Sequence, residues 1–384
     1  MEYNTSRTWL EIDLDAIEEN CRRIRRDIGT SEIMAVVKAN AYGLGAPYIA
    51  RFLEELGVRY FAVACLEEAL ELREGGVMGE ILTLGPILPM QAEAAIAHNI
   101  TSNIISLEHA EGLSQAAQQL GKKIKGHIKL DAGMARFGIM LEGRVDAAVD
   151  EAMHIASLPG LQIEGVFTHY TDADLPVGDA FNKHQIALFD EATDKLRARG
   201  LTFKKHSASS HFTSVYPQCH NDLVRVGSLL LGTDTDLEYG TQSVHATQLK
   251  SRIYQIKELD MGRPVSYGPI AYTMRPTRVA VVPVGYADGL RRTIQNRASL
   301  IVNGRFAPII GKICMDYLML DVTDIEAEVG DVVTVFGRDG DAKQELWQMA
   351  ELYGGTMGEV PTVLTTRVPR IYIRHGKYIG QVGR

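Results

Sequence analysis

The feature that most constrains the fold is a repeated alternation between residue 32 and about residue 230. Short β-rich runs alternate with segments whose apolar residues follow helical spacing, and several of these segments end in glycine. Eight strands alternating with helices is the number in a closed (β/α)8 TIM barrel, and an open doubly wound sheet is the alternative. We expect an α/β fold with a TIM barrel over residues 12–242. Its strands would be EIMAVVK (32–38), RYFAVAC (59–65), EILTLG (80–85), TSNIIS (101–106), KGHIKLD (125–131), IEGVFTH (163–169), FKKHSAS (203–209) and LVRVG (223–227).

Several of these runs end in a residue that can take part in catalysis or binding. The carboxyl ends of all eight strands meet on one face of such a barrel, and enzymes with this fold keep their active sites there. Residues that are far apart in the sequence therefore converge in space. On this ground we expect a site that includes Lys38, Lys129, His169, Ser210 and Arg225.

The pattern changes after about residue 242, where strand-rich segments with tight turns replace the alternation. Asn303-Gly304 is typical of a type I′ β-hairpin, and helical spacing is confined to a piece near residues 342–354. We expect a separate, mostly-β C-terminal domain over residues 243–384, joined by an N-terminal strand within residues 1–11.

Composition and charge argue against several classes of protein. The net charge of -8 disfavours a nucleic-acid-binding face, which would need clustered lysine and arginine. No window approaches the roughly 18 to 20 continuous apolar residues of a membrane span, and the first residues lack the apolar run of a secretory signal. The 4 cysteines are scattered, without the spacing of a zinc or redox motif. We expect a cytoplasmic protein with no metal site that binds neither nucleic acid nor membrane.

Lys38 gives the sharpest chemical prediction. A partly desolvated lysine near other cations has a lowered pKa and becomes a nucleophilic amine, although a lysine at a strand end can also be purely structural. Such amines react with carbonyl compounds, and pyridoxal 5′-phosphate is the commonest protein-bound aldehyde of this kind. The segments SASSHF (207–212) and VRVGSLLLG (224–232) offer hydroxyls and exposed amides for its phosphate.

Arg225, at the end of the eighth run, could donate a hydrogen bond to the pyridine nitrogen of that cofactor. An arginine does not give up its proton, so the pyridine nitrogen would stay neutral. A neutral pyridine is a weaker electron sink. This choice would suppress transamination and decarboxylation and favour simple removal and return of the proton at Cα.

Seven segments together resemble the alanine racemases of the pyridoxal-phosphate-dependent type, in the order in which that family carries them. The similarity extends from TWLEIDLDAI (8–17) to TRVPRIY (366–372), nearly the whole chain. The resemblance implies a homodimer with shared active sites that interconverts L-alanine and D-alanine and supplies D-alanine for cell-wall synthesis. The segments are AVVKANAYGLG, HIKLDAGMARFGI, EGVFTHYTDAD, VSYG, PVGYADGLRR, GKICMDYLMLDV and RVPR.

The family resemblance implies two acid–base groups on opposite faces of the substrate Cα. Lys38 would hold the cofactor and act on one face, and Tyr267 of VSYG, contributed by the partner subunit, would act on the other. Racemisation takes a proton from one side and returns one to the other, so two positioned groups are required. Tyrosine is normally neutral near pH 7, and His169 with Arg225 behind it would help Tyr267 to lose its proton.

The resemblance also implies residues that bind and orient the substrate. Arg136 would orient the cofactor phenolate and the substrate carboxylate, and Lys129 matches a position that members of the family often carry as a carbamate. Such a carbamate would hold Arg136, whereas two unmodified cations would repel one another. Met315 and Asp316 would reach into the partner's site, and Tyr286 would line its entrance.

The residues matching the phosphate binders of the family are Tyr42, Ser210, Gly227 and Ser228. The chain also departs from the family pattern. Thr366 stands where many relatives have a tyrosine, and RVGSLLLG stands where many relatives read RPGIALYG.

Other functions would use parts of the same pattern. A racemase of serine or of broader specificity would share the scaffold, because a hydroxyl or one methylene is discriminated only weakly. A decarboxylase of the same build would have an acidic residue at the pyridine nitrogen, where this chain has Arg225. A cofactor-carrying binding protein would lack the β domain, and a purely structural barrel would leave Lys38 without a role.

Overall fold

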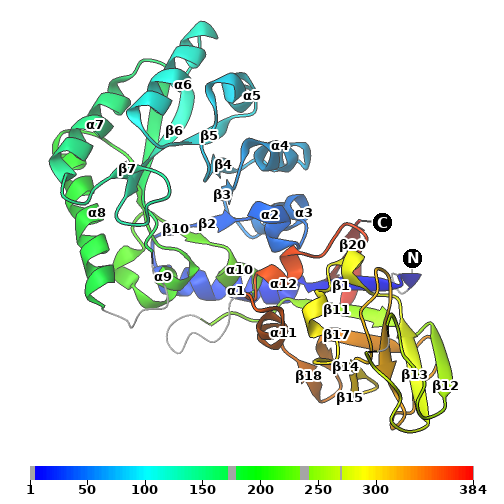
Figure 1. The fold of residues 1–384 in the computed structure, drawn as a ribbon. Coiled ribbons are helices and arrows are strands. Elements are labelled where there is room, and N and C mark those ends of the chain that lie inside the picture. Colours follow the sequence, from blue (N-terminus) through cyan, green and yellow to red (C-terminus); the bar gives the residue numbers. More distant parts are fainter. Residues whose placement is uncertain (1–4, 172–178, 234–241, 269, 384) are drawn as a thin grey trace.

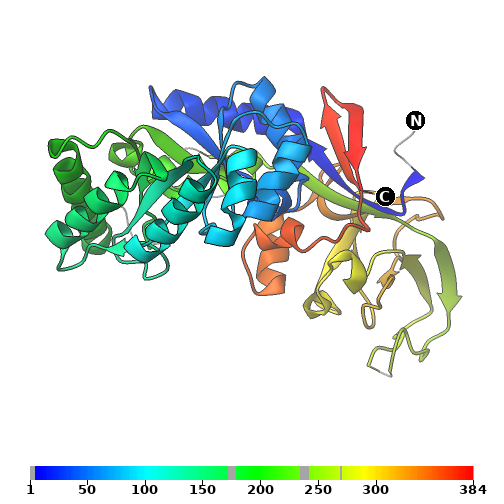
Figure 2. The same cartoon turned by 90° about the horizontal axis from the view of Figure 1, so that it is seen from above.

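The computed structural model consists of a barrel and a β-rich domain, which lie at opposite ends of an elongated molecule (Figures 1 and 2). Three parts of the sequence predictions lie outside the described residues: the start of the N-terminal strand, the last three residues of EGVFTHYTDAD, and Pro269 behind the VSYG segment. The structure describes residues 5–171, 179–233, 242–268 and 270–383.

Eight parallel strands form a closed barrel, which confirms the prediction. They are hydrogen-bonded in the order β5-β4-β3-β2-β10-β9-β8-β6, and a pairing between β5 and β6 closes the ring. An open doubly wound sheet is excluded because it would leave two free edges. The strands are β2 (Glu32–Val36), β3 (Tyr60–Val63), β4 (Glu80–Thr83), β5 (Ile100–Ile104), β6 (Ile124–Asp131), β8 (Leu161–Phe167), β9 (Lys204–His206) and β10 (Leu223–Val226), and a short β7 (Ile139–Met140) pairs with β6.

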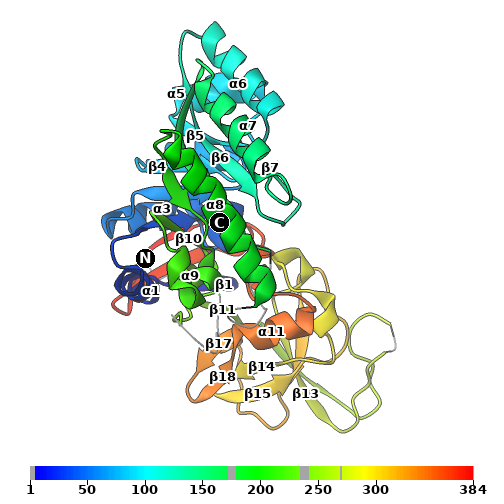
Figure 3. The same cartoon turned by 90° about the vertical axis from the view of Figure 1, so that its left-hand side faces the viewer.

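Helices cover the outside of the barrel, and α6, α7 and α8 run side by side along one flank (Figures 1 and 3). Among the described helices, none combines the length and the apolar character of a membrane span. The helices of this domain are α1 (Leu14–Ile28), α2 (Lys38–Tyr42), α3 (Ala46–Glu55), α4 (Leu66–Glu74), α5 (Ala92–Ala97), α6 (Leu107–Gln119), α7 (Val145–Ser157), α8 (Ala180–Ala198), α9 (Ser210–Val215) and α10 (Ser228–Leu231).

The sequence of α1 explains how one of these helices forms. Asp13 caps it, because its carboxylate accepts hydrogen bonds from two amides of the first turn. Ile17, Cys21, Ile24 and Ile28 follow one another at helical spacing, and all four are buried. The helix therefore packs one apolar stripe against the barrel and exposes Arg22, Arg25 and Arg26 to solvent.

The C-terminal domain consists of two sheets. The larger has the order β15-β14-β17-β11-β1-β19-β20, with β18 beside β17, and the smaller has the order β12-β13-β16. Asn303 and Gly304 both have positive φ angles between β14 and β15, as a type I′ hairpin requires. The strands are β11 (Thr247–Arg252), β12 (Gln255–Leu259), β13 (Thr277–Val282), β14 (Ser299–Val302), β15 (Arg305–Pro308), β16 (Leu318–Asp321), β17 (Val332–Asp339), β18 (Ala342–Gln344), β19 (Arg370–Arg374) and β20 (Lys377–Val382).

The strand β1 (Thr8–Asp13) precedes the barrel in sequence but lies inside this larger sheet. It pairs antiparallel with β11 and parallel with β19. Two short helices, α11 (Leu346–Tyr353) and α12 (Glu359–Thr362), lie between the sheets and the barrel (Figure 2). The chain therefore begins in the β-rich domain, forms the barrel and then returns.

Candidate active site

A cavity of about 320 Å³ opens where the carboxyl ends of the barrel strands meet. Nine of the residues expected from the sequence line it: Lys38, Tyr42, Lys129, Arg136, His169, Ser210, Arg225, Gly227 and Ser228. Six further residues line the cavity: Val36, Leu84, Phe137, Phe167, Ser209 and His211.

Lys38 begins a turn of left-handed helix. The four residues from Ala39 to Tyr42 have φ angles of 51, 56, 53 and 55°. None of them is glycine, and this conformation costs roughly 1–2 kcal/mol per residue. Two i→i−4 backbone hydrogen bonds of 2.9 Å support the turn, and Asn40 Oδ1 accepts a further bond of 2.8 Å from the amide of Ala46. The turn fixes the direction in which Tyr42 leaves the backbone.

Residues of the C-terminal domain hold this turn from outside the barrel. Arg370 Nε donates to the carbonyl oxygen of Gly43 at 2.8 Å, and Tyr372 Oη donates to the carbonyl oxygen of Leu44 at 2.8 Å. A Cβ atom at Gly43 would lie 2.1 Å from the carbonyl oxygen of Pro361, so only glycine allows this close approach. The second domain therefore contributes to the position of Lys38.

The environment of Lys38 favours a neutral, nucleophilic amine. Burial, and secondly the positive charge of Arg136, lower the pKa of Lys38 below its usual value. Glu68 acts in the opposite direction, but its carboxylate also accepts hydrogen bonds of 2.7 Å from the amides of Ala39 and Ala64. The burial and charge that the sequence prediction required at Lys38 are therefore present.

Hydroxyl groups and closely packed backbone form a second part of the cavity. Ser210 Oγ accepts hydrogen bonds from the amides of Gly227 and Leu229 at 3.1 and 3.3 Å, which leaves its own proton to be donated elsewhere. A Cβ atom at Gly227 would lie 2.6 Å from Tyr42 Oη, so the glycine lets this hydroxyl approach the loop. With Ser228 beside them, these groups fit a phosphate.

Arg225 is buried, and the hydrogen-bond acceptors of its side chain among the described residues are all neutral. Nη2 donates to the carbonyl oxygens of Thr168 and Ser207, at 2.8 and 3.1 Å, and to His169 Nδ1 at 3.0 Å. Nη1 donates to His206 Nδ1 at 3.2 Å. Burial lowers the pKa of Arg225 to about 10, so the side chain is still a cation at neutral pH. A guanidinium can only donate, so both imidazoles carry their proton on Nε2.

A second histidine extends this chain of hydrogen bonds into the barrel. His206 donates from Nε2 to His127 Nδ1 at 2.9 Å, and its ring stacks on Phe167 with centroids 4.8 Å apart. Burial, followed by nearby positive charges, lowers the pKa of His127 to about 3 and that of His169 to about 2. All three histidines are therefore neutral at physiological pH. Sequence reasoning found only His169, because His127 and His206 lie within strands that read as ordinary core.

The buried histidines predict how the folded state responds to acid. An unfolded histidine has a pKa near 6.5 and the folded His127 about 3, so between these values the unfolded chain binds more protons. Stability is therefore lost as pH falls below about 6.5, by up to about 1.4 kcal/mol per pH unit for each such histidine. His127→Asn keeps an acceptor for His206 but does not titrate. From pH 7 to 5 its unfolding free energy in urea should fall by about 2 kcal/mol less than that of the wild type.

The exposed His98 provides the control for this measurement. His98→Asn should lose as much unfolding free energy as the wild type over the same pH interval. Equal losses in the wild type and His127→Asn would contradict the assignment of a neutral, buried His127.

Lys129 is buried among other cations. Its Nζ lies 4.6 Å from the centroid of the Phe167 ring. Burial, and then the charges of Arg225 and Arg136, lower the pKa of Lys129 to about 7, although Asp131 opposes this shift. A large fraction of the side chain is therefore a neutral amine near pH 7.

The four remaining predicted residues lie on the C-terminal domain. Tyr267, Met315 and Tyr286 are 69, 53 and 42% exposed, and Asp316 is half-buried. None of the four is among the described residues that line the cavity of the same chain. The side chains of Tyr267, Met315 and Tyr286 are thus available to a surface outside this chain.

Comparison with known proteins gives the family. A family model for the alanine racemase N-terminal domain matches residues 12–235, and one for the C-terminal domain matches residues 246–372. The chain belongs to the alanine racemase family. Among its relatives, alanine racemase 2 of Caldanaerobacter subterraneus subsp. tengcongensis is 37% identical and covers 96% of each chain. The alanine racemase of Clostridium perfringens is 36% identical over 97% of this chain and 96% of its own.

Solved structures of alanine racemases have the same architecture. The Clostridium difficile 630 alanine racemase has a TM-score of 0.93 and 32% identity, with 99% of each chain covered. The Bacillus anthracis alanine racemase with bound L-Ala-P has a TM-score of 0.92 and 32% identity, with 98% of each chain covered. The resemblance noted from the motifs is therefore confirmed, and this member of the alanine racemase family is an amino-acid racemase.

Proposed function

We propose that this protein interconverts L-alanine and D-alanine with pyridoxal 5′-phosphate, by a two-base mechanism, in a homodimer whose active sites contain residues of both subunits. The observation that carries the proposal is the cavity itself. It combines the Lys38 amine, whose pKa is lowered, with a group of hydroxyls and backbone amides that fits a phosphate. It also contains a buried Arg225, whose hydrogen-bond acceptors within the described part of the chain are neutral. Cytoplasmic location and supply of D-alanine to the cell wall belong to the same proposal, as do domain limits at residues 12–242 and 243–384.

The residues of the cavity fit the cofactor. Lys38 would hold its aldehyde carbon, Arg225 its pyridine nitrogen, and the group formed by Tyr42, Ser210, Gly227 and Ser228 its phosphate. When bound, pyridoxal phosphate withdraws electrons from the substrate Cα and makes the proton there removable. Arg225 stays protonated at neutral pH, so it would donate to the ring nitrogen without transferring a proton. This limits the electron withdrawal to what proton exchange at Cα needs.

The remaining steps belong to side chains of the protein. The Lys38 amine would take or return the proton on one face of Cα, and the partner subunit's Tyr267 would do so on the other. Arg136 would pair with the substrate carboxylate, supported by the backbone at Met315. His169 holds its proton on Nε2 because Arg225 occupies Nδ1, so this N–H would donate a hydrogen bond to the Tyr267 oxygen when Tyr267 is deprotonated.

A dimer would bring these groups together. Tyr267 and Tyr286 are exposed on a domain that contributes nothing to the cavity lining described for its own chain. A second copy could supply both residues to the cavity, and the Lys38 cavity of that copy would receive them in return. Such an exchange makes the interface isologous, as in most soluble dimers.

The experiment that tests the proposal is proton–deuterium exchange at Cα, followed by NMR in D2O with cofactor-loaded protein. L-Alanine should exchange its Cα proton and give the D-isomer, while L-serine should react more slowly. If serine reacted faster than alanine, serine would be the substrate and the protein would be a serine racemase. Exchange with neither amino acid would overturn the proposed activity.

Lys129 is expected to carry a carbamate. The neutral amine adds to CO2 and releases one proton, which creates an anion between Arg136 and Arg225 in place of a third cation. Because the pKa of Lys129 is lowered to about 7, the reactive form is lost as pH falls below that value. Protein incubated with ¹³C-bicarbonate should show a carbamate resonance in ¹³C NMR at pH 8 that weakens towards pH 6.

Two variants test whether the carbamate resonance comes from Lys129 or from another lysine. Lys129→Met should abolish the resonance, and replacement of the exposed Lys123 by methionine should leave it unchanged. A resonance that survives in Lys129→Met would contradict the assignment.

A further inference from the structure

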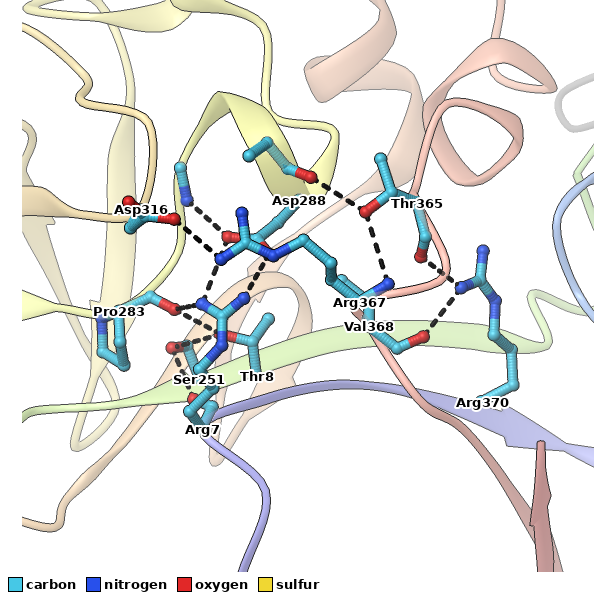
Figure 4. A network of polar contacts seen from close by, with 12 residues as sticks. Arg7, Thr8, Ser251, Pro283, Asp288, Asp316, Thr365, Arg367, Val368 and Arg370 are labelled. Atoms are coloured by element: carbon cyan, nitrogen blue, oxygen red, sulfur yellow. Dashed lines mark hydrogen bonds and ion pairs between the residues drawn. The ribbon is translucent and has the colours of Figure 1, made fainter. Parts of the chain in front are cut away.

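A buried ion network lies next to the two exposed loops that carry Tyr286 and Met315 (Figure 4). At its centre is Asp288, whose side chain is 0% exposed. Arg7 pairs with both of its carboxylate oxygens, the longer contact, from Nη1 to Oδ2, being 3.2 Å. Arg367 approaches the same carboxylate with Nε 3.6 Å from Oδ1. Two arginines from distant parts of the chain thus share one carboxylate.

The guanidinium of Arg367 also binds a second carboxylate, which lies nearer the surface than Asp288. Its Nη2 donates to Asp316 Oδ1 at 2.7 Å, and Asp316 directly follows Met315. One guanidinium therefore connects the 285–288 turn, through Asp288, to the 314–316 loop, through Asp316. Figure 4 shows Arg367 between the two carboxylates.

The two loops are also joined directly through their backbones. The amides of Tyr286 and Ala287 donate to the carbonyl oxygens of Cys314 and Met315, at 3.1 and 3.0 Å. A Cβ atom at Gly285 would lie 2.3 Å from the Met315 carbonyl oxygen, so the loops touch without a gap. A shift of one loop would therefore move the other.

The strand β1 anchors the network on its other side. Thr8 Oγ1 donates to the carbonyl oxygen of Pro283 at 2.8 Å, and Ser251 Oγ donates to the carbonyl oxygen of Arg7 at 2.9 Å. Thr8 and Ser251 are 0% exposed. Buried hydrogen bonds therefore fix the network on the side of β1. Arg367 connects this fixed part to Asp316.

We propose that Arg367 is a positioning residue for the active site of the partner subunit: by bridging Asp288 and Asp316 it fixes the two loops that present Tyr286 and Met315 to the partner's cavity. This inference rests on the proposed shared-site racemase. Arg367 would not touch the substrate or the cofactor, and its effect would be transmitted to the other subunit.

The proposal predicts a change in KM for alanine without a change in stability, whereas a purely structural role of Arg367 would lower the unfolding temperature. Asp288 keeps its pair with Arg7 when Arg367 is replaced. The pair that is lost with Asp316 is partly exposed, at 42 and 41% of the two side chains, and such ion pairs contribute little to stability. Arg367→Gln should therefore unfold at the same temperature as the wild type. Its KM for alanine should rise about 10- to 100-fold, because groups that orient the substrate are displaced by a fraction of an ångström to one ångström. Its kcat should change less than its KM.

The matched control is Arg275→Gln. Arg275 pairs with Asp324 on the same domain, and both side chains are exposed. This variant should leave KM, kcat and the unfolding temperature at their wild-type values. An unchanged KM in Arg367→Gln, or an equal rise in KM in both variants, would overturn the proposal.

A mixed dimer tests whether the effect crosses the interface. Subunits carrying Arg367→Gln and Lys38→Ala can be coexpressed with different tags and purified in sequence. The only working cavity then belongs to the Arg367→Gln chain, but its loops come from the Lys38→Ala chain, where Arg367 is intact. A KM restored to the wild-type value supports the proposal. A KM as high as that of the Arg367→Gln homodimer overturns it, because Arg367 would then act on its own subunit's cavity.

The proposed function has its own test, which does not involve Arg367. Mixed dimers of Lys38→Ala and Tyr267→Phe should recover activity, because one of their two sites is intact. Failure of that complementation would refute the shared site itself, and with it the basis of this inference.

Discussion

Replacing Lys38 by alanine is expected to lower kcat for alanine racemisation by at least about 10⁴-fold, the upper end of what one acid–base group contributes. The variant loses both the group proposed to hold the cofactor and one of the two proposed bases. It should also fail to retain the cofactor through a covalent bond, which borohydride reduction followed by mass spectrometry would detect in the wild type. The fold should persist, since Lys38 is only partly buried.

Two further variants make this result specific. Lys38→Arg keeps a positive charge but cannot form the covalent bond, so it should be as inactive as the alanine variant. Replacement of the exposed Lys123 by alanine should change neither measurement. Covalent retention of the cofactor in Lys38→Ala would mean that another lysine performs the role, and Lys129 also lines this cavity.

Tyr267→Phe is expected to lower kcat with L-alanine by about 10²- to 10⁴-fold while the cofactor stays bound. Phenylalanine keeps the ring and removes only the hydroxyl that would exchange a proton with Cα. D-Alanine should still exchange its Cα proton with solvent through Lys38, but without inversion. Deuterium incorporation and chiral chromatography on the same sample would measure both processes.

Tyr272, on the same loop and 49% exposed, offers the control. Tyr272→Phe should keep wild-type racemisation. In random mixtures of Lys38→Ala and Tyr267→Phe subunits, roughly a quarter of the wild-type activity should return, because half the dimers are mixed and each holds one intact site. A Tyr267→Phe enzyme that racemises L-alanine at the wild-type rate would exclude this tyrosine as the second base.

The barrel could be predicted from the sequence because its strands and helices carry local patterns. Each of the eight expected runs overlaps an observed strand, and Lys38, Lys129 and Arg225 line one cavity because parallel strands end on one face. The left-handed turn after Lys38 could not be predicted, since Ala39 and Ala41 favour right-handed helix. Its support includes hydrogen bonds from residues more than 300 positions away, Arg370 and Tyr372, which the local sequence does not indicate.

The contacts between buried polar side chains could not be predicted from the sequence for a related reason. Nothing near His127 in the sequence indicates that its ring meets His206, 79 residues later. Asp288 likewise reads as part of a turn, and its partner Arg7 is 281 positions away. Residue type and local spacing identify groups that can do chemistry, but they do not say which groups meet.

The position of β1 has a consequence for synthesis and folding. Residues 8–13 are synthesised before their strand partners, which are residues 247–251 and 370–373. During translation this strand has an open edge on both sides until those two segments have left the ribosome, and open edges promote association with other chains. The barrel can close earlier, because its strands lie within residues 32–226. Arg7 can pair with Asp288 only after the second domain has formed, so a truncated chain would contain the Lys38 cavity without the loops that serve its partner.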